Sequence, residues 1–384
     1  MRVYFDNAAT TPLAPEVIEA MTDAMRHLSG NPSSIHADGR AARAAVEDAR
    51  KRIARLIGAG IGEVFFTSGG TEANNMVLKN AVRDLGVRRI VSSKIEHHAV
   101  LHTLERLEKT AGITVEYVNL DKNGRVLLGN LDKILRGSAD KTLVSLMHAN
   151  NEIGTLTDLE TVSAICYSHG ALFHSDTVQT MGFYPIDVSK TPIDFLNAAA
   201  HKFHGPKGVG FVYINSENVL KPFIDGGTQE RNMRGGTENV YGIVGMARAL
   251  KLAYENLAAR QKHISDLRNY LKNNLLETFS DIEFLGDTEG GHFKILNVSF
   301  PPTAKSDLLL FNLDISGISA SGGSACSSGA EGGSHVLDAL DIDPSRKCIR
   351  FSFSHLNTRD EVDFLIEKLK RLTPLHEAVS SIKN

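Results

Sequence analysis

Short apolar runs that alternate with helical stretches are the feature that most constrains this chain. They fall at residues 64–67, 90–91, 115–120, 143–147, 171–173 and 195–198. After the first run, we expect the polar stretch SGGTEANN to form a loop and residues 76–84 to form a helix. Because parallel strands are joined by crossover helices, this alternation predicts a mostly parallel sheet with helices on both faces. The predicted fold class is α/β.

The flanking segments predict a second, smaller unit. Helices are expected at residues 17–27 and 40–57, and one or two helices at 240–279. A helix as long as the last one commonly bridges two domains. Beyond it the sequence predicts strands at 282–285, 295–300 and 349–353, with helices that start at Ser306 and Thr358. This is an α+β pattern.

Composition excludes several classes of function. The 384 residues are enough for a substantial core, and the apolar fraction of 42% and charged fraction of 23% are typical of a globular protein. A net charge of −3 gives no reason to expect nucleic acid or an anionic membrane as a partner. We find no apolar stretch long enough to span a membrane and no apolar signal core at the N-terminus. The three cysteines, Cys166, Cys326 and Cys348, are an odd number in a large chain, which argues against a disulfide framework and predicts a cytoplasmic protein.

A lysine in an unusual setting, Lys202, lies between the apolar runs 194–199 and 209–214. Burying an ammonium is costly, so a lysine that enters a core is usually paired, neutralised or reacted. The glycines and proline of residues 205–210 predict a tight turn that brings backbone close to whatever the lysine binds. We therefore expect Lys202 to form a Schiff base with pyridoxal phosphate. A lysine in a surface loop is the alternative.

An acidic residue, Asp176, follows the apolar run 171–173 at the expected end of a strand. Ligands of open α/β sheets bind at the carboxyl ends of the strands. A pyridoxal enzyme also needs a carboxylate that faces the ring nitrogen and keeps it protonated. Asp176 and Lys202 fit that pair of roles, although two unrelated polar strand ends would give the same pattern.

Eight motifs then occur in one order along the chain. They read SGGTEANN, IEHHAV, MHANNEIG, HSDTVQ, AAAHKFHGPKGVG, RGGTEN, SGGSACSSG and CIRFSF. Together they resemble the cysteine desulfurases of the NifS/IscS type, which are fold-type-I pyridoxal-phosphate enzymes of the class V aminotransferase family. The resemblance extends from Asp6 to about Leu372. It implies a large cofactor-binding α/β domain at residues 14–260, and a small α+β domain made of residues 1–13 and 261–384.

The resemblance also assigns a phosphate site. In the loop SGGTEANN, two glycines allow backbone amides to approach an anion near a helix N-terminus. The resemblance gives this role to Gly70 and Thr71, with His201 and with Thr237 from a partner subunit, so it implies a homodimer. A plain turn in which Thr71 caps the helix is the alternative. The chain departs from the family at Ala199, where the family usually has a hydroxyl residue that contacts the phosphate.

Other positions match cofactor and substrate contacts of the family. Of two adjacent histidines, the resemblance selects His97 to stack on the cofactor ring and to shuttle protons, so we expect His98 to point elsewhere. Asn151 and Gln179 carry amides that could bond the cofactor's phenolic oxygen and the substrate carboxylate, or simply satisfy loop backbone.

Arg350 lies on a strand between Ile349 and Phe351, so its side chain should point to the face opposite to both. A guanidinium there could bind the substrate carboxylate with two parallel hydrogen bonds. A surface salt bridge is the alternative.

Cys326 lies in a stretch dominated by glycine and serine, SASGGSACSSGAEGGS, where no packed element is expected. Cys166 and Cys348 have the setting of ordinary buried cysteines. The resemblance therefore implies that Cys326 attacks the substrate sulfur. Only a few per cent of a thiol with the usual pKa of about 8.5 is ionised at neutral pH, so we expect a nearby positive charge or a proton-accepting histidine.

The predicted function is the conversion of L-cysteine to L-alanine. Lys202 removes the Cα proton, Cys326 takes the sulfur as a persulfide, and the sulfur passes to an iron–sulfur scaffold or another acceptor protein. No metal is expected. A selenocysteine lyase, another class V aminotransferase, and a non-catalytic sulfur-relay subunit are the alternatives.

Overall fold

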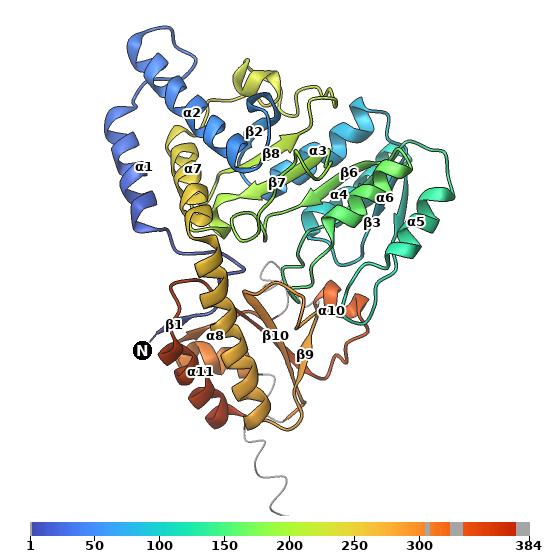
Figure 1. Ribbon diagram of the computed structural model, residues 1–384, viewed down its shortest axis with the longest axis vertical. Helices are drawn as coiled ribbons and strands as arrows, with labels where there is room; N and C mark the ends of the chain where they lie inside the picture. Colours follow the sequence, from blue (N-terminus) through green and yellow to red (C-terminus); the bar gives the residue numbers. More distant parts are fainter. Residues whose placement is uncertain (1, 304–307, 323–332, 374–384) are drawn as a thin grey trace, which may run out of the picture.

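The computed structural model describes residues 2–303, 308–322 and 333–373. Within them, the largest sheet has seven strands in the order β2-β8-β7-β6-β5-β3-β4 (Figure 1). All neighbours are parallel except β8, which runs antiparallel to both β2 and β7. The strands are β2 (Val64–Thr67), β3 (Arg89–Ser92), β4 (Thr114–Tyr117), β5 (Thr142–Ser145), β6 (Leu172–Asp176), β7 (Phe195–Ala199) and β8 (Gly210–Ile214). The predicted mostly parallel α/β sheet is confirmed.

Helices cover both faces of this sheet because successive strand residues point to opposite sides. Ile90 and Leu143 pack into one apolar cluster with residues of α3 and α4, whereas Val91 and Val144 pack into another cluster with residues of α2, α6 and α7. The helices of this region are α1 (Pro15–His27), α2 (Ala37–Leu56), α3 (Gly70–Asp84), α4 (His98–Ala111), α5 (Leu128–Arg136), α6 (Leu159–Ser168) and α7 (Val240–Glu255). Short 3-10 turns lie at η1 (Ile61–Glu63), η2 (Ala200–Lys202) and η3 (Gln229–Asn232).

The prediction of a loop over SGGTEANN is wrong in one respect, since α3 begins at Gly70 and not at Met76. The turn between β2 and α3 is shorter because Gly69 adopts a φ of 152° that directs the chain straight into the helix. A Cβ on Gly70 would lie 2.7 Å from Cγ2 of Val178, so a larger residue here would force the valine side chain or the helix to shift. The helix packs against β7 and β8, so tertiary contacts override the turn-like composition of its first residues.

The rest of the chain forms a second region, which is built around a smaller antiparallel sheet in the order β12-β10-β9. The elements here are α8 (Leu257–Thr278), β9 (Glu283–Leu285), β10 (Ile295–Phe300), α9 (Leu309–Ile315), β11 (Ile318–Ser319), α10 (His335–Ala339), β12 (Lys347–Ser352) and α11 (Arg359–Leu372). The N-terminal strand β1 (Val3–Tyr4) pairs with β11 in parallel. The predicted strands at 282–285, 295–300 and 349–353 are confirmed to within a few residues.

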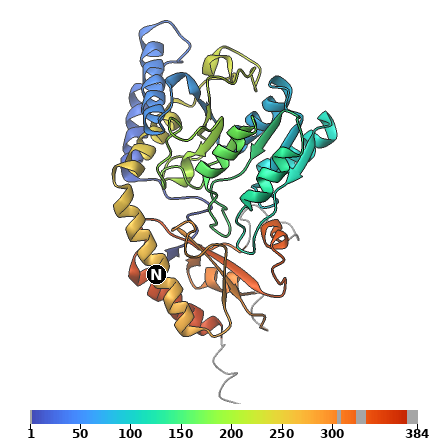
Figure 2. The same ribbon diagram turned by 45° about the vertical axis from the view of Figure 1, so that its right-hand side comes forward.

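The long helical stretch is broken at Asn256 into α7 and α8. Helix α7 packs against α1 and α2, whereas α8 packs against α11 and β10. Both views show α8 running from the region of the large sheet to the region of the small one (Figures 1 and 2).

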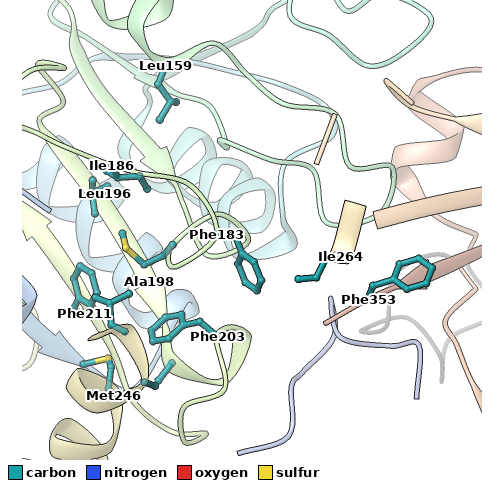
Figure 3. Packing of buried hydrophobic residues seen from close by; sticks show 14 of the residues in the cluster. Leu159, Phe183, Ile186, Leu196, Ala198, Phe203, Phe211, Met246, Ile264 and Phe353 are labelled. Carbon is teal, nitrogen blue, oxygen red and sulfur yellow. The ribbon is translucent and has the colours of Figure 1, made fainter. Parts of the chain in front are cut away.

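Apolar side chains connect the region of the large sheet with the region of the small one. One buried cluster includes Leu196 and Phe211 of the large sheet together with Ile264 of α8 and Phe353 after β12. Phe183, from the segment after β6, lies between these groups (Figure 3). The pocket described next is therefore built on a continuous packed core, which fixes its walls.

Candidate active site

A pocket of about 250 Å³ lies at the carboxyl ends of the parallel strands and collects most of the predicted residues. Its lining comes from the large sheet, the N-terminal segment and β12. The predicted residues that line it are Gly70, Thr71, His97, Asn151, Asp176, Gln179, His201, Lys202 and Arg350. Thr237 does not line it, and Cys326 lies outside the described residues.

Lys202 ends the short turn η2, directly after β7. Its Nζ donates hydrogen bonds to the backbone carbonyls of Ala8 at 2.7 Å and Ala9 at 2.8 Å. The lysine lines the pocket, so the alternative of a surface-loop lysine is wrong. Sequence reasoning missed Ala8 and Ala9, because two alanines carry no signal of a role that only their carbonyl groups perform.

Asp176 is the last residue of β6 and only 7% exposed. Its Oδ2 accepts a hydrogen bond from Nδ2 of Asn74 at 2.7 Å, and its Oδ1 accepts one from the backbone N–H of Val178 at 3.0 Å. Asn74 is in turn fixed by Asn197, whose Nδ2 donates to Asn74 Oδ1 at 2.8 Å. These bonds hold the carboxylate in one orientation at the pocket wall. The buried amide of Asn74, inside a stretch expected to be a loop, was not identified from the sequence.

The start of α3 contributes Gly70 and Thr71 to the pocket. Backbone N–H groups at a helix N-terminus attract an anion, and the absent Cβ of Gly70 leaves the backbone accessible. The alternative in which Thr71 caps the helix is wrong, because Gly69 occupies the N-cap position and no side chain bonds there. This end of the pocket fits a phosphate group.

His201 lies beside the same end of the pocket. Its Nδ1 is 3.2 Å from Oγ1 of Thr10. Burial, reinforced by the positive charges of Lys202, Lys207 and Lys294, lowers the pKa of His201 to about 4. A neutral imidazole here can donate or accept a hydrogen bond, depending on its tautomer. Ala199 also lines the pocket but has no polar side-chain atom to offer.

His97 is the N-cap of α4, and its Nδ1 accepts a hydrogen bond from the backbone N–H of Ala99 at 3.0 Å. Burial is the main cause that lowers the pKa of His97. His98, the first residue of α4, also lines the pocket. The expectation that His98 points elsewhere is therefore wrong: the helix start places both rings at the pocket, with centroids 6.4 Å apart.

Arg350 is 1% exposed and points away from Ile349 and Phe351, which pack in the core. Its Nη1 donates to the carbonyl of Asn151 at 2.6 Å, and its Nη2 donates to Oδ1 of Asp6 at 2.8 Å. The alternative of a salt bridge is correct in that Arg350 is ion-paired, but the pair is buried at the pocket and not at the surface. Sequence reasoning missed Asp6, which lies 344 positions away along the chain.

Gln179 donates from Nε2 to the carbonyl of Ala8 at 2.9 Å. Its Oε1 is buried without a hydrogen-bond partner among the described residues, as is Nε of Arg350. A buried polar atom without a partner costs free energy unless a ligand or water satisfies it. These two atoms therefore favour a polar ligand in the pocket.

Buried ionisable groups behind the pocket wall were also missed. Glu96 is 1% exposed, and burial, together with the negative charge of Asp176, raises its pKa to about 8. Lys294 is fully buried, and burial together with the positive charges of Lys202 and Arg350 lowers its pKa well below the usual 10.5. Neither residue belongs to a motif that could have identified it.

The remaining predicted residues lie elsewhere. Thr237 is exposed and lines a separate cavity with Glu230 and Asn239. Cys166 is buried, and burial raises its pKa to about 12, whereas Cys348 is half-buried. The ordinary setting predicted for Cys166 is confirmed, and Cys348 is more accessible than expected.

The fold and the pocket are those of a pyridoxal-phosphate enzyme. A sequence model of the family described as Aminotransferase class-V matches residues 3–365, so the chain belongs to that family. Enzymes of this family use pyridoxal phosphate, and the cofactor and family predicted from the sequence are confirmed.

Within the family the chain is similar to proteins named for desulfuration of cysteine. It is 41% identical to "Cysteine desulfurase IscS" of Dictyoglomus turgidum, with 99% of this chain and 97% of that protein covered. It is 42% identical to "Putative cysteine desulfurase IscS 1" of Bacillus subtilis, with 97% and 100% covered. A solved structure titled "NIFS-LIKE PROTEIN" shares 39% identity at a TM-score of 0.89 and covers 97% of this chain and 99% of its own.

None of the helices in the described ranges has the length and apolar character needed to cross a bilayer.

Proposed function

We propose that the chain is a pyridoxal-phosphate-dependent cysteine desulfurase that converts L-cysteine to L-alanine and transfers the sulfur to Cys326 as a persulfide. The observation that supports this most is that one pocket collects Lys202, Asp176 and Arg350 from three separate segments. An amine, a carboxylate and a guanidinium are the groups needed to bind an aldehyde cofactor and an amino acid. The similarity to named cysteine desulfurases supports the same reaction.

Pyridoxal phosphate fits this pocket. Gly70, Thr71 and His201 would hold its phosphate, and the fixed carboxylate of Asp176 would hold its protonated ring nitrogen. Asn151 would bond its phenolic oxygen, with Gln179 beside it and the ring of His97 stacked on its face. When bound, the cofactor supplies an aldehyde that reacts with amines and a ring that withdraws electrons from the substrate Cα.

Lys202 takes the proton from the substrate Cα in this proposal. The carbonyls of Ala8 and Ala9 accept hydrogen bonds from its Nζ, so they stabilise the ammonium that results. Arg350 binds the substrate carboxylate, and its pairing with Asp6 keeps the guanidinium plane in place. His97 carries its proton on Nε2, because its Nδ1 already accepts from Ala99, so it can donate to a developing negative charge.

The thiol of Cys326 attacks the substrate sulfur, and the resulting persulfide passes to an acceptor protein such as an iron–sulfur cluster scaffold. We also propose that the chain acts in the cytoplasm as a homodimer. Thr237 supports the dimer: it is exposed and does not line the pocket of its own chain, so in a second copy it could complete the phosphate site. Each copy would consist of a large domain at residues 14–260 and a small domain of residues 1–13 and 261–384.

The test compares Cys326→Ser with the matched control Cys348→Ser. We expect Cys326→Ser to keep the absorbance of the bound cofactor but to lose formation of alanine and sulfide from cysteine. Cys348→Ser should retain turnover. Unimpaired alanine formation by Cys326→Ser would show that the chain does not transfer sulfur through this thiol.

A further inference from the structure

Thr11 bridges the two ends of the turn that carries Lys202. The residue is 5% exposed and belongs to the N-terminal segment, 190 positions before His201 in the sequence. Its backbone N–H and its hydroxyl both donate to the carbonyl of His201, each at 2.9 Å. The same hydroxyl oxygen accepts the backbone N–H of His204 at 2.7 Å. One side chain therefore binds the backbone on both sides of Lys202, directly before it and two residues after it.

The backbone of this turn is supported from outside at His204. Its φ of 65° is in the left-handed region, which residues other than glycine rarely adopt. The N-terminal segment holds it there through the hydroxyl of Thr11, through the carbonyl of Pro12 at 2.9 Å from its Nδ1, and through the backbone N–H of Ala14, which donates to its carbonyl at 3.1 Å. Such a conformation persists only where surrounding contacts impose it. Residues 11–14 therefore help to impose the geometry of the turn.

The position of Lys202 depends on the same segment at both ends of its side chain. The lysine ends the short 3-10 turn η2, and its Nζ donates to the carbonyls of Ala8 at 2.7 Å and Ala9 at 2.8 Å. Its backbone is held by Thr11 through the neighbouring residues. Thr11 itself does not line the pocket, so it acts on a ligand there only through the residues that it holds.

We propose that Thr11 is a positioning residue for proton transfer by Lys202. The proposal rests on the proposed function, in which Nζ of Lys202 takes the proton from the substrate Cα. In that step the C–H bond breaks, an N–H bond forms, and the electron pair stays on the substrate. Proton transfer depends steeply on the distance between the two heavy atoms, and a misplacement of about 1 Å can slow a reaction about 100-fold. The hydroxyl of Thr11 sets this distance through the backbone of His201 and His204.

The experiment is exchange of the Cα proton of L-alanine in D2O, followed by NMR. It isolates the step because no sulfur is transferred: Nζ takes the proton, exchanges it with solvent and returns a deuteron. The variant Thr11→Val keeps the shape of the side chain and removes the hydroxyl. At saturating alanine we expect it to exchange the proton about 10 to 100 times more slowly than the parent. Thr11→Ser keeps the hydroxyl and should stay within about threefold of the parent.

The control is Thr142→Val, the same substitution at an equally buried threonine. Thr142 is also 5% exposed, and its hydroxyl donates to the carbonyl of Asp140 at 2.8 Å. It begins β5, at the amino end of a strand whose carboxyl end faces the pocket. The exchange rate of Thr142→Val should stay within about twofold of that of the parent, because no residue of the pocket is displaced.

A second measurement examines the turn itself in the protein without cofactor. Amide hydrogen exchange should become faster by about tenfold in peptides of Thr11→Val that span residues 201–205, because the N–H of His204 loses its acceptor. Peptides from α5 should exchange as in the parent. This result would show that the variant is folded and that the change is local to the turn.

An exchange rate of Thr11→Val within about twofold of the parent, or an equal loss in Thr11→Ser, would overturn the proposal. An equal loss in Thr142→Val would also overturn it, because the effect would then follow from removing any buried hydroxyl. Absence of exchange in the parent would overturn it together with the role of Lys202. A failure of sulfur transfer would appear separately, as formation of alanine from cysteine retained by Cys326→Ser, and would leave the exchange results unchanged.

Discussion

Lys294 gives the prediction that most directly tests the electrostatics of the pocket wall. The residue is 0% exposed, and its Nζ has no hydrogen-bond partner among the described residues. Its nearest favourable contact is the ring of Phe183, with the nitrogen 4.0 Å from the ring centroid. The charges that act on it most, those of Lys202 and Arg350, are of its own sign. The folded chain therefore opposes an ammonium at this position.

The substitution Lys294→Met removes this group and keeps the apolar length of the side chain. The pKa of Lys294 is lowered in the folded chain from the usual 10.5, so the unfolded chain binds more protons between the two pKa values. In that window the free energy of unfolding of the parent, relative to the variant, rises with pH by up to about 1.4 kcal/mol per pH unit. Near neutral pH we expect the variant to be the more stable protein, because it no longer buries an unpaired amine.

The assay is urea-induced unfolding of parent and variant at about pH 7.5, 8.5 and 9.5, read as the difference in unfolding free energy. The control is Lys251→Met, which makes the same substitution at an exposed position on α7. It measures how much of the change in unfolding free energy comes from the unfolded chain. A difference between parent and Lys294→Met that does not change with pH would refute the reasoning.

Three further predictions follow from other contacts. Glu230→Ala leaves the guanidinium of Arg50 buried without its two bonds of 2.8 Å, so unfolding should become easier by about 3–5 kcal/mol, measured by denaturant titration. Glu96→Gln should remove a pH dependence: because burial raises the pKa of Glu96 from 4.5 to about 8, the parent should lose stability relative to the variant as pH rises through that range. Parallel stability curves would contradict this. Arg350→Lys should raise KM for cysteine on the order of tenfold with less change in kcat, because an ammonium cannot form two parallel bonds to a carboxylate; an unchanged KM would remove Arg350 from substrate binding.

The sequence was sufficient for the large sheet because its signal is local. Each strand is a short apolar run, and successive residues such as Ile90 and Val91 separate onto two faces whatever the rest of the chain does. The start of α3 was misjudged for the opposite reason, since the packing of the helix against β7 and β8 decides it. The turn-like composition of this stretch does not reveal that tertiary contact.

The site was predictable where side-chain chemistry is tied to a motif, as at Lys202 and Asp176, which the fold brings into one pocket. It was not predictable where the contribution comes from backbone or from distant pairing. The carbonyls of Ala8 and Ala9 and the carboxylate of Asp6 act on residues almost 200 or more positions away. The position of His98 at the pocket was also missed, because sequence spacing does not show where the start of α4 places each ring.

The N-terminal segment determines when the active site can assemble during synthesis of the chain. Phe5 accepts a hydrogen bond from the backbone of Ser352, and Asn7 donates to the carbonyl of the same residue. The N-terminal residues are synthesised first, but they are held in place by residues synthesised more than 300 positions later. Until then, Ala8 and Ala9 cannot contact Lys202, and Asp6 cannot contact Arg350. A nascent chain that has already built its large sheet should therefore remain catalytically incompetent until β12 has emerged and paired with the N-terminal segment.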